Sequence, residues 1–161
     1  MTVSRSVHVS IDIDAHQYAV WERISEHEDT PSWIEAVKQV KLAQDGTTHN
    51  GVGAVRLVSF KGVPTVAHER ITLFEPPRAF EYVLFKGQPA LVSHRGRVSI
   101  EDLGQGRSRL RWDVDFVFRS VHPFRLLLPY FLRRLDAILK AGMANLKQQM
   151  ETQQTSPHPQ A

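Results

Sequence analysis

The chain has 161 residues, of which 42% are hydrophobic and 23% are charged, a size and composition typical of one globular domain. The formal net charge of +3 is only weak support for an anionic partner, and no apolar run is long enough to span a membrane. The absence of cysteine excludes disulfides and thiolate chemistry and fits a reducing compartment, so we expect a cytoplasmic protein.

The N-terminal part of the chain predicts one strand followed by two short helices. Apolar residues alternate with polar ones over residues 7–13, which indicates a half-buried strand. Asp14 is expected to cap the first helix, in a capping box with Gln17. A second short helix is expected to begin at Thr30-Pro31 and to run towards Val37.

The middle of the chain predicts six further strands. Strand-like runs recur between turn signals such as Asp45-Gly46 and Lys61-Gly62. The turns between consecutive runs are short, so we expect antiparallel neighbours in a meander. The expected strands cover residues 38–44, 52–60, 63–74, 79–85, 90–102 and 107–119.

The C-terminal part predicts one long helix. Beyond residue 123 the apolar residues, Leu135 among them, recur three or four positions apart. Pro129 lies inside this run and is expected to kink the helix or to mark its restart. We expect residues 1–151 to form a single domain and residues 152–161 to be a disordered tail. A wide antiparallel sheet needs a cover, and this helix is the only expected element long enough to provide one.

Six segments, spread over about residues 3–151, have an order and spacing that are informative together. They are 20-VWERI-24, 31-PSWIEAV-37, 51-GVGAVR-56, 69-ERITLFEPPRAFEY-82, 107-RSRLRWDVDF-116 and 135-LDAILKAGMANLKQQME-151. Their arrangement resembles the helix-grip fold of the START-like superfamily, in its polyketide cyclase/dehydrase and lipid-transport branch. The resemblance implies an α+β fold in which a curved seven-stranded antiparallel sheet wraps around the long C-terminal helix, with two short helices after strand one. It selects no activity, because the superfamily contains binding proteins, cyclases, hydrolases and proteins that present lipids or quinones.

Two charged residues are predicted on the inner face of the sheet. Alternation along residues 63–74 places Glu69 inside, where a carboxylate needs a partner. A tight turn at Lys61-Gly62 would set Arg56 opposite Ala67 and diagonal to Glu69. We therefore predict an Arg56–Glu69 ion pair in or at the rim of a cavity between sheet and helix. The pair could be a ligand clamp or an acid/base pair, and it could equally be structural.

The other candidate ligand-binding residues are less polar. His94 is predicted on the inner face of residues 90–102, either as a proton shuttle or ligand contact or as a satisfied core residue. Tyr82 and Trp112 are predicted to line the core and the cavity wall together. Trp33 on the second short helix is a candidate gate, and Leu135 on the long helix completes the predicted contact set.

Several kinds of site are not supported by the sequence. No His or acidic residues have compact metal-ligand spacing, and no nucleophile elbow is present, so neither a metal site nor covalent catalysis is expected. Gly51 and Gly53 begin a GxGxxG-like stretch, but its third position is Arg56 and a strand follows. We expect these glycines to bend the chain at the sheet entrance, and we expect no nucleotide or other cofactor.

A basic outer face is expected on the hairpin formed by residues 90–102 and 107–119. The simplest interpretation is a solvated face held by salt bridges, and the alternative is transient docking to an anionic membrane or an acidic carrier protein. The face lacks the exposed aromatic residues of a nucleic-acid groove, so no nucleic-acid partner is expected. The basic residues on it are Arg95, Arg97, Arg107, Arg109 and Arg111.

Three functional hypotheses remain open at this point. The first, implied by the resemblance and the apolar inner faces, is binding or carrying of a hydrophobic small molecule such as a lipid, a quinone or a polyketide-like ring system. The second is a cyclase, aromatase or dehydratase that uses Glu69, Arg56 and His94, with Tyr82, as its acid/base set. The third is a partner-binding module that uses the basic outer face.

Overall fold

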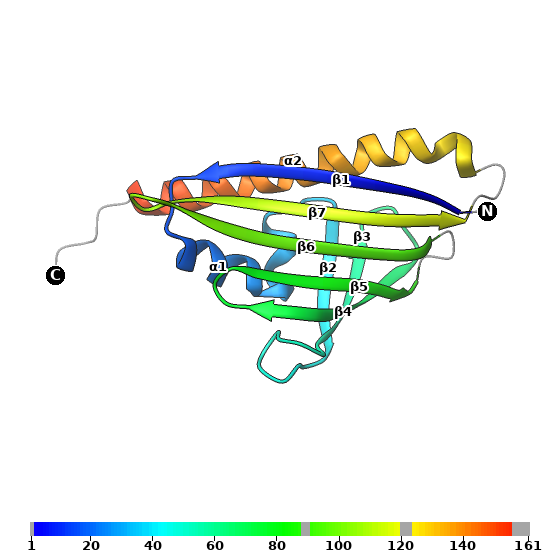
Figure 1. The fold of residues 1–161 in the computed structure, drawn as a ribbon, viewed down its shortest axis with the longest axis horizontal. Coiled ribbons are helices and arrows are strands. Elements are labelled where there is room, and N and C mark those ends of the chain that lie inside the picture. Colours follow the sequence, from blue (N-terminus) through cyan, green and yellow to red (C-terminus); the bar gives the residue numbers. More distant parts are fainter. Residues whose placement is uncertain (1, 88–90, 120–123, 156–161) are drawn as a thin grey trace.

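The computed structural model describes residues 2–87, 91–119 and 124–155. One antiparallel sheet curves through the molecule, and a long helix lies alongside its first strand (Figure 1). In chain order the elements are β1 (Thr2–Ile13), α1 (Gln17–Ser25), the 3-10 helix η1 (His27–Ser32), β2 (Val37–Gln44), β3 (Val55–Phe60), β4 (Val66–Glu75), β5 (Ala79–Lys86), β6 (Leu91–Gly104), β7 (Arg107–Arg119) and α2 (Phe124–Thr155).

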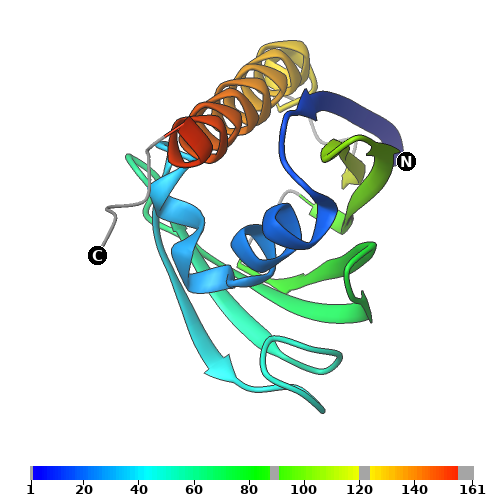
Figure 2. The same ribbon diagram turned by 90° about the vertical axis from the view of Figure 1, so that its left-hand side faces the viewer.

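The strands form a single seven-stranded sheet in the order β1-β7-β6-β5-β4-β3-β2. Strands β2 to β7 therefore make a continuous meander, and β1 joins it on the far side of β7. Figure 2 looks along the curved sheet and shows α2 beside the β1 edge, with α1 on the concave side. The predicted fold is confirmed: an α+β arrangement in which a curved antiparallel sheet is closed by the C-terminal helix.

The first short helix lies where expected although its predicted cap is wrong, and the second lies earlier in the chain than predicted. His16 caps α1 by accepting a hydrogen bond from the backbone N–H of Tyr18, so the predicted capping box of Asp14 and Gln17 does not form. The Asp14 carboxylate instead accepts a hydrogen bond from Arg107 Nε at 3.2 Å. The 3-10 helix η1 ends at Ser32, close to where the second helix was predicted to begin.

The register of the β3–β4 hairpin differs from the predicted register by two residues. Arg56 pairs directly with Glu69, and Val58 pairs with Ala67. The predicted two-residue turn is wrong because the connection spans residues 61–65 and contains Pro64, which has no N–H for a ladder hydrogen bond. Since side chains alternate with a period of two, the shift leaves Arg56 on the inner face.

Bulges change the inner face at two other places. Strict alternation from His94 would point Val92 inward, but Val92 is 53% exposed, because the pairing with β7 shifts between Leu91 and Ser93 and Leu91 packs inward instead. Alternation from Glu69 would also point Val63 inward, but Val63 lies in the β3–β4 connection and is exposed. Strand β4 is irregular between Ile71 and Leu73, and beyond that point Phe74 packs against the core.

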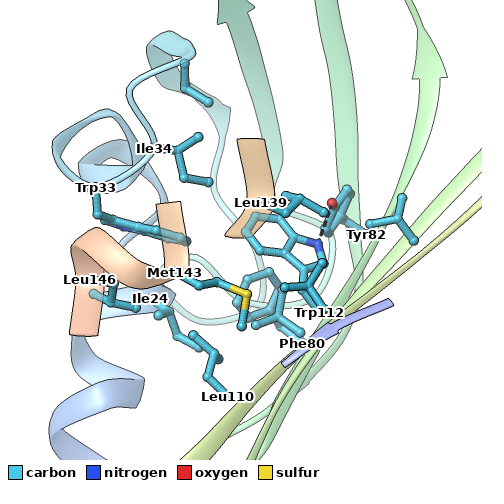
Figure 3. Close-up of a cluster of buried hydrophobic side chains, with 14 of the residues drawn as sticks. Ile24, Trp33, Ile34, Phe80, Tyr82, Leu110, Trp112, Leu139, Met143 and Leu146 are labelled. Atoms are coloured by element: carbon cyan, nitrogen blue, oxygen red, sulfur yellow. Dashed lines mark hydrogen bonds between the residues drawn. The ribbon is translucent and has the colours of Figure 1, made fainter. Parts of the chain in front are cut away.

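Helix α2 begins where predicted and extends beyond its predicted end. It begins at Phe124 and runs through Pro129, so the proline does not mark a restart. It continues to Thr155, so the first residues of the predicted tail are helical, while residues 156–161 lie outside the described part of the chain. Leu139, Met143 and Leu146 on this helix pack into the core against the segment that follows η1 (Figure 3).

Glycine at position 96 is required by the packing of Tyr82. The two residues pair across β5 and β6, and a Cβ at Gly96 would overlap the Tyr82 ring. We expect Gly96→Ala to lower the free energy of unfolding by about 1–3 kcal/mol, because the ring is fully enclosed and has no space to move into. Urea unfolding followed by circular dichroism measures the change. The control is Ser93→Ala on the exposed face of β6, which should stay within about 0.5 kcal/mol of the parent.

Candidate functional site

A buried ion pair lies on the inner face of β3 and β4. Arg56 is 6% exposed and Glu69 is 4% exposed, and Arg56 Nε donates to Glu69 Oε2 at 2.7 Å. The predicted Arg56–Glu69 pair is therefore confirmed, with direct rather than diagonal pairing of the two residues. Such a pair removes two charges from water and is stable only if further contacts satisfy the guanidinium.

His27 supplies one of those contacts. Its ring is fully buried, with Nδ1 at 3.2 Å from an Arg56 Nη atom and Nε2 at 3.2 Å from the carbonyl oxygen of Asn50. The guanidinium can only donate, so Nδ1 accepts and Nε2 carries the proton that goes to Asn50. Burial, helped by the charge of Arg56, lowers the pKa of His27 to about 3, and the ring is neutral at physiological pH.

Tyr82 covers the other side of the Arg56 guanidinium. The Arg56 Cζ atom lies 4.3 Å from the centroid of the Tyr82 ring, close enough for a cation–π contact. The Tyr82 hydroxyl accepts a hydrogen bond from Trp112 Nε1 at 3.0 Å, drawn as the dashed line in Figure 3. Burial raises the pKa of Tyr82, with the charge of Glu69 acting in the same direction, so the phenol stays protonated. Arg56 is thus held by a carboxylate, an imidazole and an aromatic face.

His94 lies on the same row of the sheet but has different surroundings. Cross-strand pairing joins Glu69 to Leu84, Leu84 to His94 and His94 to Phe116. The His94 ring stacks on Phe116 with a centroid distance of 4.8 Å. Among the described residues it has no hydrogen-bond partner, and burial lowers its pKa, so it is a neutral imidazole with a free donor and a free acceptor.

A pocket of about 440 Å³ opens at the end of β5, beside the start of β6 and the end of β7. Leu84 and Leu91 form its inner part, and Lys86 and Arg119 also line it. Arg56, Glu69 and His94 are not among the lining residues, but Leu84 is, and it pairs with Glu69 on one side and with His94 on the other. One wall residue of the pocket therefore belongs to the same inner row as these two polar residues.

The remaining predicted ligand contacts belong to the packed core. Trp33 is buried with its ring centroid 5.9 Å from that of Trp112, and Leu135 is half-buried against the same cluster. Trp33 Nε1 is buried and has no hydrogen-bond partner among the described residues. None of these three residues lines the 440 Å³ pocket, so their ligand contacts and the gate role of Trp33 stay predictions.

The basic outer face is held by ion pairs, as the simpler interpretation predicted. Arg95 and Arg97 both donate to Glu81, a buried carboxylate of β5 that the sequence pattern did not indicate as their partner. Arg109 makes two hydrogen bonds to Asp12 of β1, at 2.7 and 3.1 Å. Among the described residues Arg111 has no ion pair, and docking through this face stays a prediction.

The glycine-rich stretch before β3 sets the backbone conformation with which the chain enters the sheet. Gly53 has φ +90°, a conformation that favours glycine, and its N–H donates to the carbonyl oxygen of Ile71 at 2.9 Å. The chain then enters β3 rather than a helix.

Within residues 2–87, 91–119 and 124–155, no three His, Asp or Glu side chains are arranged to hold a metal ion. No helix in this part of the chain is both long and apolar enough to span a membrane.

Comparison with known proteins identifies relatives of this fold. The family model described as polyketide cyclase / dehydrase and lipid transport matches residues 4–151. No curated protein matches the sequence. The Zhui aromatase/cyclase from Streptomyces sp. R1128 has a similar structure, with a TM-score of 0.78 and 16% identity over 96% of this chain and 98% of that chain. A START superfamily protein from Mycobacterium smegmatis has a TM-score of 0.73 and 17% identity over 92% of this chain and 98% of that chain. Norcoclaurine synthase from Thalictrum flavum has a TM-score of 0.73 and 12% identity over 96% of this chain and 99% of that chain.

Proposed function

The chain belongs to the polyketide cyclase / dehydrase and lipid transport family, and from this premise we propose that it binds a hydrophobic small molecule at the open end of the grip. The candidate ligands are a lipid, a quinone or a polyketide-like ring system. One observation carries the proposal: a pocket of about 440 Å³ is lined by Leu84, the cross-strand partner of His94, and His94 is an interior imidazole without a hydrogen-bond partner among the described residues. Ligand sites commonly combine apolar walls with a few such polar groups.

Exposed apolar residues around the pocket support this location. Phe85 and Val92 line it and are both largely exposed. In Figure 1 the start of α2 lies at the same end of the molecule as the end of β5 and the start of β6. That part of α2 carries the exposed residues Leu126, Leu127 and Tyr130. An exposed apolar group of this kind is typical of ligand entry sites and interaction surfaces.

Leu84 and His94 have distinct parts in this proposal. A ligand in the pocket packs against Leu84, which is the wall residue paired with His94 across β5 and β6. If the ligand displaces the Leu84 side chain, its polar group reaches a neutral imidazole that can donate one hydrogen bond and accept another. His94 then discriminates between ligands that carry a carbonyl or hydroxyl group and wholly apolar ones.

We expect Leu84→Trp to weaken ligand binding at least tenfold, because the larger ring fills the inner part of the pocket. The ligand is first identified by native mass spectrometry of gently purified protein, and affinity is then measured by calorimetry. The matched control is Thr72→Trp on the exposed part of β4, which adds a similar ring away from the pocket. Unchanged affinity in Leu84→Trp would place the ligand elsewhere.

A second candidate function is the cyclase or aromatase chemistry of the same family. It is favoured by one arrangement: Glu69 and His94 flank Leu84 on a single inner row, with Arg56 beside Glu69. A neutral imidazole is in the protonation state that a general base requires, and enclosure would orient the reacting chain. With a polyketide-like substrate, Glu69→Gln should abolish turnover while binding persists. Turnover that survives in this variant would eliminate Glu69 from the chemistry.

A further inference from the structure

Two cations in the wall of the pocket lack counter-charges. Lys86 and Arg119 both line it, and neither has an ion pair or a hydrogen bond from its side chain to the described residues. The lining residues that the structure describes include no Asp or Glu. On the outer face of the sheet, by contrast, Arg95, Arg97 and Arg109 are each bonded to a carboxylate.

The rest of the pocket wall divides into an apolar inner part and a more exposed outer part. Leu84 and Leu91 are half-buried and pack against the core, so they form the inner part. Lys86 and Arg119 are the last residues of β5 and β7, and both side chains are exposed. The pocket therefore combines an apolar floor with a cationic rim.

We propose that this pocket takes an acidic amphiphile, with its anionic group between Lys86 and Arg119 and its apolar body against Leu84 and Leu91. The inference rests on the proposed ligand-binding function and names the chemical class of the ligand. Burying either cation beneath an uncharged ligand would cost hydration without compensation, whereas an anionic group forms charge-assisted hydrogen bonds with both.

The interior fixes the direction in which such a ligand lies. On the inner row Leu84 is flanked by His94, which is neutral, and by Glu69, whose carboxylate repels an anion. The one cation of that row, Arg56, is already bonded to Glu69 and covered by Tyr82. An anionic group therefore remains at the Lys86–Arg119 rim, and the uncharged part of the ligand enters first.

The test compares three probes of one chain length by calorimetry on the full-length protein: decanoate and decyl phosphate below their micelle concentrations, and decan-1-ol below its solubility limit. We expect at least one anionic probe to bind about tenfold more tightly than the alcohol, a difference that increased salt reduces. In the double variant Lys86→Gln/Arg119→Gln this preference should disappear while affinity for decan-1-ol is unchanged. The tighter of the two anionic probes shows whether the site prefers carboxylate or phosphate.

The matched control is Lys41→Gln/Arg78→Gln, which removes the same net charge from two exposed residues that do not line the pocket. It should keep the preference for the anionic probe. If the alcohol and both anionic probes bind equally, or if the control loses the preference as the pocket variant does, the assignment of an anionic ligand is overturned while ligand binding stands. If no probe binds, the proposed function falls and this inference falls with it.

Discussion

Replacing Glu69 with leucine is expected to lower the free energy of unfolding by about 3–5 kcal/mol, because it leaves the Arg56 guanidinium buried without a counter-charge. Arg56 is only 6% exposed, and its other contacts are a neutral imidazole, His27, and the face of Tyr82. Neither of these carries the negative charge that would offset the desolvation of the guanidinium. Urea denaturation followed by circular dichroism at pH 7 measures the loss.

Two further variants make this prediction specific to the buried charge. The double variant Arg56→Met/Glu69→Leu should recover most of the lost stability, because replacing both members of a buried pair by apolar residues is often close to neutral. Glu81→Leu is the matched control: Glu81 is equally buried, but its partners Arg95 and Arg97 are exposed and can turn to water. A loss in Glu69→Leu no larger than that in Glu81→Leu would contradict the prediction.

The face of Arg56 was predictable from the sequence, whereas its register was not. Alternation places Glu69 on the inner face, and counting back from the turn then places Arg56 on the same face, an assignment that survives a two-residue error in the turn. The register depends on how the chain passes Pro64 between β3 and β4, which is a property of one connection rather than of a pattern. The ion pair was therefore predicted correctly although the turn used to predict it was wrong.

His27 was missed because no pattern covers it. It lies on a six-residue 3-10 helix, outside every predicted strand, and its partners Arg56 and Asn50 are 29 and 23 residues further along the chain. Only the closure of η1 against β2 and the neighbouring strands brings them together. Similarly, Glu81 alternates onto the outer face of β5, and its burial there depends on Arg95 and Arg97 of the next strand.

The position of the pocket could not be derived from alternation either. Alternation identified His94 as an inner residue but said nothing about which inner residues would face open space. That depends on where the strands end, on the bulge that exposes Val92, and on the line that α2 takes across the sheet. A pattern of period two describes faces, whereas a pocket is a property of the ends of several elements.

The pH dependence of stability is the second large expected effect, and it arises from His27. Burial lowers the pKa of His27 from 6.5 to about 3, so the unfolded chain takes up this proton before the folded chain does. Stability is therefore complete above pH 6.5 and falls as the pH is lowered towards 3. The slope approaches about 1.4 kcal/mol per pH unit, which amounts to about 2 kcal/mol at pH 5.

Asp12 and Glu151 do not obscure this window. The pKa values of Asp12 and Glu151 lie below their ordinary range because Arg109 bonds the first and the backbone N–H of Asp14 bonds the second. Both therefore stay ionised between pH 5 and pH 7. His94, whose pKa burial also lowers, adds to the loss with the same sign. Exposed His49 has the opposite sign, because its hydrogen bond to Asp45 raises its pKa and stabilises the protonated form.

Urea midpoints of the parent and of His27→Gln at pH 7, 6 and 5 test this assignment. Glutamine can accept from Arg56 and donate to Asn50 but does not titrate, so the variant should be less stable at pH 7 and clearly flatter between pH 7 and pH 5. The control His49→Gln should keep the full decline of the parent, because the bonded proton at His49 opposes the loss rather than causing it. If the stability of His27→Gln declined as steeply as that of the parent, the pH dependence would arise from other groups. The buried His27 imidazole beside Arg56 would then be protonated in the folded chain as easily as in the unfolded one.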